Sequence, residues 1–284
     1  METNKVKVIF ISGSSHSGST LLDKVLGSHP NGVSLGEVYL TYQKFKEKPE
    51  QFDNHKCSCG VNGNVCVFWQ KIFIIWSSND VKSYNQAYSL MLDHFITVYG
   101  KHAFLIDSSK YLPAIKEIQN LNDIELYIIH LIKDIRSYIV SQIDRAKQKG
   151  KYRRFANLKH ARSWYNQNKK IQDYLSSKSM NYINLGYEEL CMFPKLALND
   201  ICEFIGEPQV LELSKLENDK SHLLTGNAMR LDPKKSAIQY DFRWFNRRDW
   251  ILPYYFWKKV RNYNSKVVYS RNYNQIFERS RKKE

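Results

Sequence analysis

The chain has 284 residues, of which 43% are hydrophobic and 25% charged, a composition typical of a folded globular protein rather than a disordered one. Its formal net charge of +15 favours an anionic ligand, an acidic partner or nucleic acid, without choosing among them. No apolar run approaches the roughly 20 residues that a membrane span needs, and no secretory signal is visible. Since five cysteines also argue against a disulfide scaffold, we expect a cytoplasmic protein with no membrane span.

The predicted elements alternate between strands and helices along the chain. Four runs that are β-branched or mostly apolar are expected as strands: 5–12, 104–107, 126–132 and 181–185. Three segments with helical periodicity, each followed by a glycine, are expected as helices: 18–26, 81–99 and 195–205. Strands separated by helical segments of this length predict a P-loop-like, three-layer α/β/α fold with a central, mostly parallel sheet.

The chain shows no internal repeat and no linker that would divide it. We therefore expect one domain over residues 1–270. The segment from about 40 to 80 is polar and contains cysteines, and we interpret it as an irregular insertion over the sheet. Residues 271–284 are expected to form a basic C-terminal tail.

The strongest functional signal is the sequence GSSHSGST, which runs from Gly13 to Thr20 between the first predicted strand and helix. Glycines allow a tight turn, and the start of a helix presents unpaired N–H groups and a positive dipole end to an anion. In a Walker A loop, GxxxxGK[ST], the lysine that reaches the β- and γ-phosphates would stand at Ser19. The loop therefore suits one phosphate and a sulfate better than ATP, and the plain alternative is a turn that binds nothing.

The segment GSSHSGSTLL, from Gly13 to Leu22, resembles the 5′-phosphosulfate-binding loop of sulfotransferases that use 3′-phosphoadenosine 5′-phosphosulfate (PAPS), usually close to GxPRSGTTLL. The resemblance is to the bacterial small-molecule type, and it implies PAPS as co-substrate and 3′-phosphoadenosine 5′-phosphate (PAP) as product. It implies donor contacts by the loop residues Ser15, His16, Ser17, Gly18, Ser19 and Thr20. Since His16 replaces the usual Arg or Lys, the resemblance does not extend to a permanent positive charge at the sulfate.

A second segment, KDIRSYIVS from Lys133 to Ser141, follows the predicted strand at 126–132. It is similar to the family's 3′-phosphate motif, an arginine at the strand end and a serine eight residues later. Lys133 keeps the positive charge of that arginine but loses its bidentate fork, and Arg136 is a further nearby cation. The alternative is a solvated strand end followed by a helix cap at Asp134.

Two weaker matches extend the resemblance. The segment YEEL, which starts at Tyr187, resembles the family's YExL…P segment, in which the tyrosine lies near the nucleotide. The segment HLLTGNAMR, which starts at His222, resembles an H…GNxxR segment that closes over the donor. The resemblance therefore implies further donor contacts by Tyr187, Asn227 and Arg230.

Three residues are expected to act in catalysis. Glu37 lies 21 residues after His16, the spacing that separates the loop arginine from the catalytic base of tyrosylprotein sulfotransferases. The resemblance therefore implies that Glu37 is the base, and we expect His16 to act at the sulfate. Lys110 follows the predicted strand at 104–107 and is expected to stabilise the bridging oxygen of the leaving phosphate. The alternatives are that Glu37 and Lys110 are solvated surface residues and that His102 or His222 is the base.

Three cysteines and a histidine gather within the expected insertion. His55, Cys57, Cys59 and Cys66 form H-x-C-x-C-G…C-x-F-W, similar to an element of some bacterial sulfotransferases. Three thiolates and an imidazole fit a tetrahedral zinc site, but the usual paired CxxC knuckles are missing, so the expected cofactors include no metal. Zinc binding, a disulfide from Cys66 to Cys57 or Cys59, and free thiols are the alternatives left open.

The resemblance implies a sulfotransferase that moves the sulfuryl group of PAPS to a hydroxyl or amine of a small-molecule acceptor. A bacterial natural product, such as a saxitoxin-like guanidinium toxin, is the expected kind of acceptor. The alternatives are a sugar, lipid or tyrosine acceptor, and a P-loop kinase, against which the missing Walker lysine counts. Basic residues are spread along the chain rather than gathered in one motif, so we expect no nucleic-acid partner.

Overall fold

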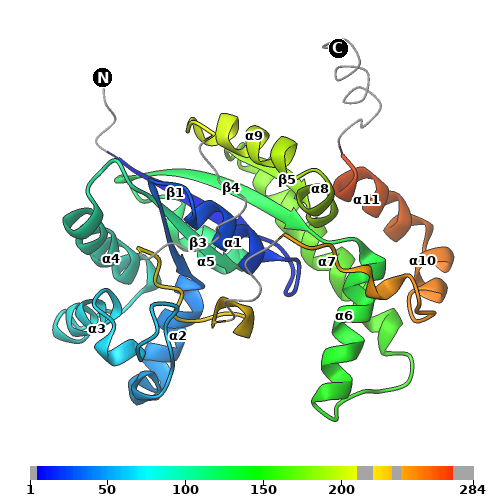
Figure 1. Cartoon of the computed structure of the whole chain (residues 1–284), viewed down its shortest axis with the longest axis horizontal. Helices are drawn as coiled ribbons and strands as arrows, with labels where there is room; N and C mark the ends of the chain where they lie inside the picture. The colour runs from blue at the N-terminus through cyan, green and yellow to red at the C-terminus, as the bar shows by residue number, and fades with distance from the viewer. Residues whose placement is uncertain (1–4, 210–219, 232–237, 271–284) are drawn as a thin grey trace.

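A five-stranded sheet in the order β2-β3-β1-β4-β5 forms the middle layer of the computed structural model (Figure 1). The structure describes residues 5–209, 220–231 and 238–270. The strands are β1 (Val6–Ser12), β2 (Gly32–Gly36), β3 (Phe104–Lys110), β4 (Ile124–Ile132) and β5 (Tyr182–Gly186). Each neighbouring pair is parallel, which confirms the predicted α/β class. The short strand β2 was not predicted, and β3 continues past Asp107, where the predicted strand ended, to Lys110.

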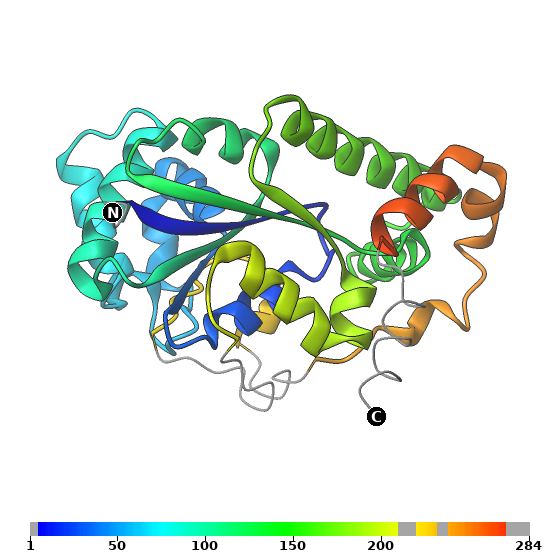
Figure 2. The ribbon, with the colours of Figure 1, turned by 90° about the horizontal axis from the view of Figure 1, so that it is seen from above.

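Helices cover both faces of this sheet, as Figure 2 shows. On one face lie α1 (Ser19–Gly27), α8 (Tyr187–Met192) and α9 (Pro194–Ile205). On the other lie α2 (Val38–Glu47), α3 (Trp69–Ser78), α4 (Tyr84–Tyr99), α5 (Leu112–Ile118) and the end of α7 (Ala156–Ser177). In β1, Val8 and Phe10 point to the second group and Ile9 and Ile11 to the first. Because both faces are buried, the strand reads as a continuous apolar run.

A third apolar cluster lies beside the sheet, around the buried Trp164 of α7. It joins α7 to α6 (Ile135–Gln148) and α11 (Lys258–Val268), and partly buried residues of α10 (Ile251–Phe256) pack against it. Figure 1 shows α6, α10 and α11 on the side of the molecule opposite α2 and α3. The two groups of helices therefore stand on either side of the sheet's carboxyl-terminal edge.

The segment from 40 to 80 is more ordered than its sequence suggested. It contains most of α2, two short 3-10 helices, η1 (Pro49–Asp53) and η2 (Gly63–Val65), and all of α3. The expectation that this segment is irregular is therefore wrong. Aromatic residues carry the periodicity, since Trp69 and Trp76 are both buried and Phe73 packs beside them. The predicted tail at 271–284 lies outside the described residues. Among the described helices, none combines the length and the apolar character that crossing a bilayer demands.

The strand order places a binding crevice between β1 and β4. From β1 the chain runs to β2 and β3 on one side of the sheet, and from β4 it runs to β5 on the other. Open parallel sheets bind ligands outside the carboxyl ends of the strands at such a reversal. The loop after β1 and the segment that begins at Lys133, both singled out from the sequence, lie at this point.

Burial of a histidine in β4 makes stability depend on pH. His130 is fully buried, with its ring nitrogens 3.2 Å from Asn184 Oδ1 and 3.3 Å from Asn168 Oδ1. This burial lowers the pKa of His130 from 6.5 to about 4. Between pH 6.5 and pH 4 this histidine is protonated in the unfolded chain but neutral in the folded chain. The free energy of unfolding therefore decreases as the pH falls from 6.5 toward 4.

We expect His130→Gln to reduce this acid sensitivity. The histidine contributes up to about 3 kcal/mol to the fall in unfolding free energy over this window, and glutamine does not titrate. Urea unfolding at pH 7 and pH 4.5 measures the difference, with the exposed His102→Gln as the matched control. An equal pH dependence in the His130→Gln protein and the unaltered one contradicts the prediction.

Candidate functional site

A pocket of about 1020 Å³ opens at the carboxyl ends of β1, β3 and β4. A pocket of this size accommodates a nucleotide together with a small second ligand. Most of the residues predicted from the sequence line it: Ser15, His16, Gly18, Ser19, Thr20, Glu37, Lys110, Lys133, Ser141, Tyr187 and Asn227. Among the described residues predicted to contact the donor or to act in catalysis, Ser17 and Arg230 do not line it.

The loop between β1 and α1 is shaped by two glycines with positive φ angles. Gly13 has φ +149°, and a Cβ there would lie 2.3 Å from the carbonyl oxygen of Leu131 in β4. Gly18 has φ +95°, and a Cβ there would lie 2.4 Å from the ring of Tyr187. Any side chain at either position would clash, so the loop needs glycine in both places. The backbone thereby passes close to β4 on one side and to α8 on the other.

This loop presents unpaired polar groups. The hydroxyls of Ser14 and Ser17 are buried and have no hydrogen-bond partner among the residues that the structure describes. No described side chain caps the start of α1 at Gly18. The N–H of Leu21 donates to the carbonyl of Gly18, whereas the N–H groups of Ser19 and Thr20 have no hydrogen-bond partner among the described residues. His16 has φ +68°, a left-handed conformation that costs energy in a residue other than glycine. The unpaired hydroxyls and the N–H groups at the start of α1 suit an anion bound there.

His16 is neutral in this arrangement. Burial, together with the charges of Arg145 and two neighbouring lysines at 110 and 133, lowers the pKa of His16 from 6.5 to about 4. Nη1 of Arg145 lies 2.5 Å from Nε2 of His16, and since a guanidinium only donates, that ring nitrogen accepts. The positive charge beside the loop therefore comes from Arg145 of α6. The sequence analysis missed Arg145, although its position four residues after Ser141 on one helix was a usable signal.

A second group of cations lies at the end of β4. Nζ of Lys133 is 2.9 Å from Asp241 Oδ2, 3.4 Å from Ser141 Oγ and 4.7 Å from the centre of the Tyr187 ring. Nη2 of Arg243 is 3.3 Å from the same Ser141 hydroxyl and also bonds Asp241. The predicted pair of Lys133 and Ser141 thus lies together with Arg243, which the sequence analysis missed. Two cations and a hydroxyl therefore lie together at a second position in the same pocket.

Arg136 is not available to that second site. Its guanidinium donates to both carboxylate oxygens of Asp134, at 2.9 and 2.7 Å, and lies 4.1 Å from the ring centre of Trp244. Asp134 also caps α6 by accepting from the N–H of Arg136. The expectation of Arg136 as a spare cation is therefore wrong, because the arginine fixes the helix start and the neighbouring aromatic residues.

Glu37 and Lys110 form an ion pair in the wall of the pocket. Each residue is only 6% exposed, so neither is the solvated surface residue of the alternative interpretation. Glu37 follows β2 and starts α2, while Lys110 ends β3 with φ +68°. Because β2 and β3 are parallel neighbours, their carboxyl ends bring the two side chains together. A carboxylate and an ammonium held this way can accept a proton and stabilise a developing negative charge, respectively.

Two buried acids support the end of β3. Asp107 accepts from the N–H of Ser109 at 2.9 Å and from its hydroxyl, while Ser109 Oγ accepts from the N–H of Tyr39 at 2.8 Å. Asp23 of α1 accepts from the Ser108 hydroxyl at 2.5 Å. Burial raises the pKa of both carboxyls to about 7. This network ties β3 to α1 and α2, and so fixes the backbone from which the catalytic candidates project.

Arg230 and the two histidines considered as alternative bases lie away from the pocket. Arg230 donates to Nε2 of His55 at 3.2 Å and to the carbonyl of Lys56 at 3.2 Å, instead of reaching the pocket. His102 is exposed in the turn before β3, at the sheet edge opposite the pocket, so it is not placed to act as the base. His222 is buried beside the cysteines and is also unsuited to that role.

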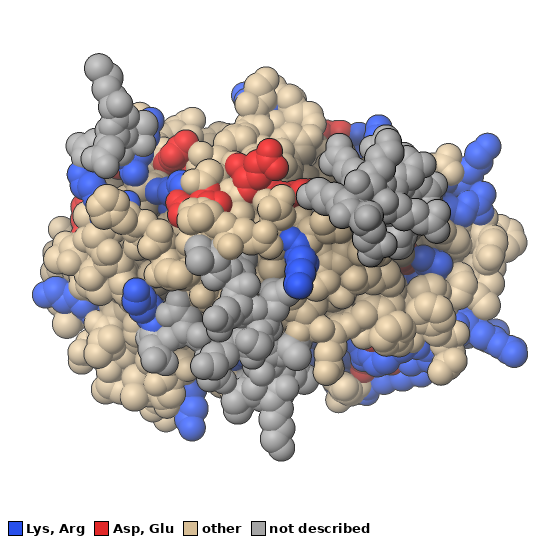
Figure 3. Space-filling model, turned by 45° about the horizontal axis from the view of Figure 1, so that its top comes forward, with Lys and Arg blue, Asp and Glu red and all other residues tan. Residues whose placement is uncertain are grey.

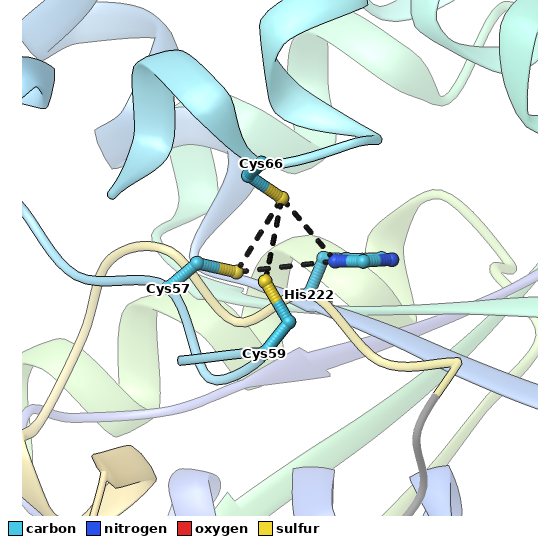
Figure 4. A group of neighbouring side chains, drawn as sticks. All are labelled: Cys57, Cys59, Cys66 and His222. Carbon is cyan, nitrogen blue, oxygen red and sulfur yellow. Dashed lines mark hydrogen bonds between the residues drawn. The ribbon is translucent and has the colours of Figure 1, made fainter. Parts of the chain in front are cut away.

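The cysteine group has a different histidine from the expected one. The thiols of Cys57, Cys59 and Cys66 converge with His222, with all four ligand atoms within 4.8 Å of one another (Figure 4). His55 instead accepts the hydrogen bond from Arg230. The prediction of His55 as the fourth member is therefore wrong, because a segment distant in sequence folds back onto the cysteines.

Basic side chains do not form a continuous stripe on the face drawn in Figure 3. Lys and Arg stand at separate places there, with uncharged surface between them. Nucleic-acid-binding proteins concentrate such residues along one face or helix. Five basic residues line the pocket: Lys110, Lys133, Arg145, Lys149 and Arg243.

Comparison with known proteins points to one family. Residues 8–210 match the model of the sulfotransferase family. The sulfotransferase domain of the olefin synthase from Synechococcus PCC 7002 is 20% identical, with a TM-score of 0.57 over 90% of this chain and 95% of that one. The sulfotransferase domain from the curacin biosynthetic pathway is 22% identical, with a TM-score of 0.48 over 91% and 92% of the two chains. No curated protein sequence matches the chain significantly.

The contact between Arg145 and His16 can be tested by titration. We expect Arg145→Gln to raise the pKa of His16 from about 4 part of the way toward 6.5, because one cause of the depression is removed while burial stays. Nuclear magnetic resonance of the imidazole C–H signals against pH measures this value. Arg162→Gln, at an exposed position of α7, is the matched control. An unchanged His16 pKa in the Arg145→Gln protein would count against the contact.

Proposed function

The chain belongs to the sulfotransferase family, and from that premise we propose that it transfers the sulfuryl group of PAPS to a hydroxyl or amine of a small-molecule acceptor, releasing PAP. The observation that carries the proposal is that two candidate anion sites, the loop after β1 and the group of Lys133, Ser141 and Arg243, line one pocket with the Glu37–Lys110 pair. A P-loop kinase, the alternative enzyme class, lacks support because Ser19 occupies the position of the triphosphate-binding lysine.

The two anion sites support a donor with phosphates at two positions. The loop after β1, with its unpaired hydroxyls at Ser14 and Ser17, would hold the 5′-phosphosulfate. Lys133, Ser141 and Arg243 would hold the 3′-phosphate through charge-assisted hydrogen bonds. Asp241 pairs with Lys133 and Arg243, and this carboxylate keeps the two cations in place.

The donor supplies an activated sulfuryl group, and the chain supplies a base, a cation and orientation. An acceptor oxygen or nitrogen forms a bond to sulfur while the bond from sulfur to the 5′-phosphate oxygen breaks. We assign Glu37 to take the acceptor's proton, and Lys110 to offset the charge that develops on the departing oxygen. Their ion pair keeps both groups in the pocket wall, and Arg145 adds positive charge next to His16 on the loop side.

The lining of the pocket favours a small organic acceptor. Next to Glu37 and Lys110 the wall includes Leu40 and Tyr111, and Tyr111 is partly open to solvent. This mixture of apolar and charged groups suits a small molecule with one reactive hydroxyl or amine. One solved structure that is similar to this chain in fold is the sulfotransferase domain of an olefin synthase, which is a biosynthetic enzyme. Bacterial natural products, saxitoxin-like guanidinium toxins among them, are therefore the first acceptors to screen, ahead of sugars, lipids and tyrosine peptides.

Donor selectivity is the first test of this function. We expect PAP to bind more tightly than ATP, and Lys133→Ala and Ser141→Ala each to weaken PAP binding about 5- to 150-fold, the equivalent of roughly 1–3 kcal/mol for a charge-assisted bond. Isothermal calorimetry measures both, with the exposed Lys169→Ala of α7 as the matched control. Tighter, magnesium-dependent binding of ATP would overturn the donor assignment.

The role of Glu37 is the second test. Glutamine keeps the size of the side chain but accepts no proton, so Glu37→Gln should lower turnover roughly 10²–10⁴-fold and leave PAP affinity within a few fold. Product mass and PAP release measure turnover once the acceptor screen has found a substrate. Glu47→Gln, at the exposed end of the same helix, should be fully active. A Glu37→Gln enzyme with normal turnover would remove Glu37 from the mechanism.

A further inference from the structure

Three thiols and one imidazole nitrogen converge on one another, as Figure 4 shows. The sulfur of Cys66 lies 3.7 Å from that of Cys57, 3.7 Å from that of Cys59 and 3.3 Å from Nδ1 of His222. Nδ1 of His222 is also 4.0 Å from the sulfur of Cys57. Cys57, Cys66 and His222 are buried, and only Cys59 is open to solvent. The four side chains enclose a common centre.

These distances are the edges of a tetrahedron of the right size for zinc. With Zn–S bonds of about 2.3 Å and Zn–N bonds of about 2.0–2.1 Å, tetrahedral geometry places two sulfurs about 3.7–3.8 Å apart and a sulfur and a nitrogen about 3.5–3.6 Å apart. Two of the three S···S edges are 3.7 Å, and two of the three S···N edges, 3.3 and 4.0 Å, bracket the expected value. The two remaining edges, from Cys59 to Cys57 and from Cys59 to His222, are no longer than 4.8 Å. A disulfide would need sulfurs about 2.05 Å apart.

The backbone around the first two cysteines forms a tight turn. The N–H of Cys57 donates to the carbonyl of Val61 at 2.8 Å, and the N–H of Gly60 donates to the carbonyl of Cys57 at 3.0 Å. Gly60 has φ +93°, a conformation that few other residues adopt. The turn carries the sulfurs of Cys57 and Cys59 to the same side, where a metal ion would sit.

His222 is held by its backbone and by its ring. Its N–H donates to the carbonyl of Ser34 in β2 at 2.7 Å, and its carbonyl accepts from the indole N–H of Trp69 at 2.7 Å. The imidazole lies nearly parallel to the ring of Phe68, 13° between planes, with centroids 5.8 Å apart. These contacts fix the ring with Nδ1 directed at the sulfurs.

We propose that Cys57, Cys59, Cys66 and Nδ1 of His222 bind one Zn²⁺. Soft thiolate ligands with one imidazole in tetrahedral geometry are a zinc set, and four protein ligands leave no position open for a substrate. The site is therefore structural. It joins the segment before α3 to the segment that contains His222, two parts of the chain that are far apart in the sequence.

The metal would also set one wall of the active-site pocket. Three residues after His222, the hydroxyl of Thr225 donates to the backbone carbonyl of Glu37 at 2.8 Å. A Cβ on the next residue, Gly226, would lie 3.0 Å from Oε1 of Glu37. Anchoring His222 thus positions the backbone that touches Glu37. This consequence rests on the proposed role of Glu37, whereas zinc binding itself does not.

Metal content of the purified full-length protein tests the site without any activity measurement. We expect about one zinc per chain by elemental mass spectrometry, and after exchange with Co²⁺ the absorption bands of tetrahedral cobalt with thiolate ligands. His222→Ala should lose most of the metal. His222→Cys should keep it, because a thiolate replaces the imidazole. His55→Ala is the matched control, since it removes the neighbouring histidine that the structure places outside the site, and it should keep its zinc.

Three results would overturn the proposal, and the first two need no variant. One is a protein grown with added zinc that carries none and gives no tetrahedral cobalt spectrum. Another is a native protein lighter by two hydrogens with two blocked thiols, which shows a disulfide. The third is loss of zinc in His55→Ala with retention in His222→Ala. If His222→Ala does not fold, the metal content and cobalt spectrum of the unaltered protein still decide. If zinc is present but no acceptor is sulfated, only the proposed function fails.

Discussion

The placement of β1 between β3 and β4 is the constraint on which the site depends. Because all five strands are parallel, their carboxyl ends meet at one edge, and the segments that follow them meet there too. The loop after β1, Lys110 at the end of β3 and Lys133 after β4 come from three separate parts of the chain, yet they line one pocket. Apolar side chains buried on both faces stabilise the sheet. The pocket residues lie at the ends of the strands and in the segments that follow them, and the core holds these segments in place.

The buried pair of Glu37 and Lys110 is better explained by chemistry than by stability. Taking two charges out of water costs about as much as their attraction returns, so such pairs seldom stabilise a fold. The surrounding structure nonetheless holds both residues firmly. Lys110 keeps a left-handed backbone at the end of a strand, and Thr225 and Gly226 pack against Glu37. Strain and buried charge concentrated at one place are typical of a site preserved for function.

The charges inside the pocket, rather than the net charge of the chain, determine which kind of ligand the pocket suits. The excess of basic residues is spread over the sequence, and on the face shown in Figure 3 it forms no single patch. Inside the pocket, burial and the nearby cations lower the pKa of His16 to about 4, and Arg145 is the cation that contacts its ring. Asp241 pairs with both Lys133 and Arg243 and so holds these two cations together.

By itself the sequence determined the fold class, through the alternation of strands and helices along the chain. It also determined the glycine-rich loop from Gly13 to Thr20 and the spacing of Lys133 and Ser141, because each of these lies in a short continuous segment. Only the tertiary structure decided that His222 rather than His55 joins the cysteines. The same holds for Arg145, whose contact with His16 joins residues 129 positions apart, and for Arg243, 102 positions from Ser141. Periodicity and spacing report on neighbours along one helix or strand, whereas side chains from distant segments meet only when the packing of the sheet and its helices brings those segments together.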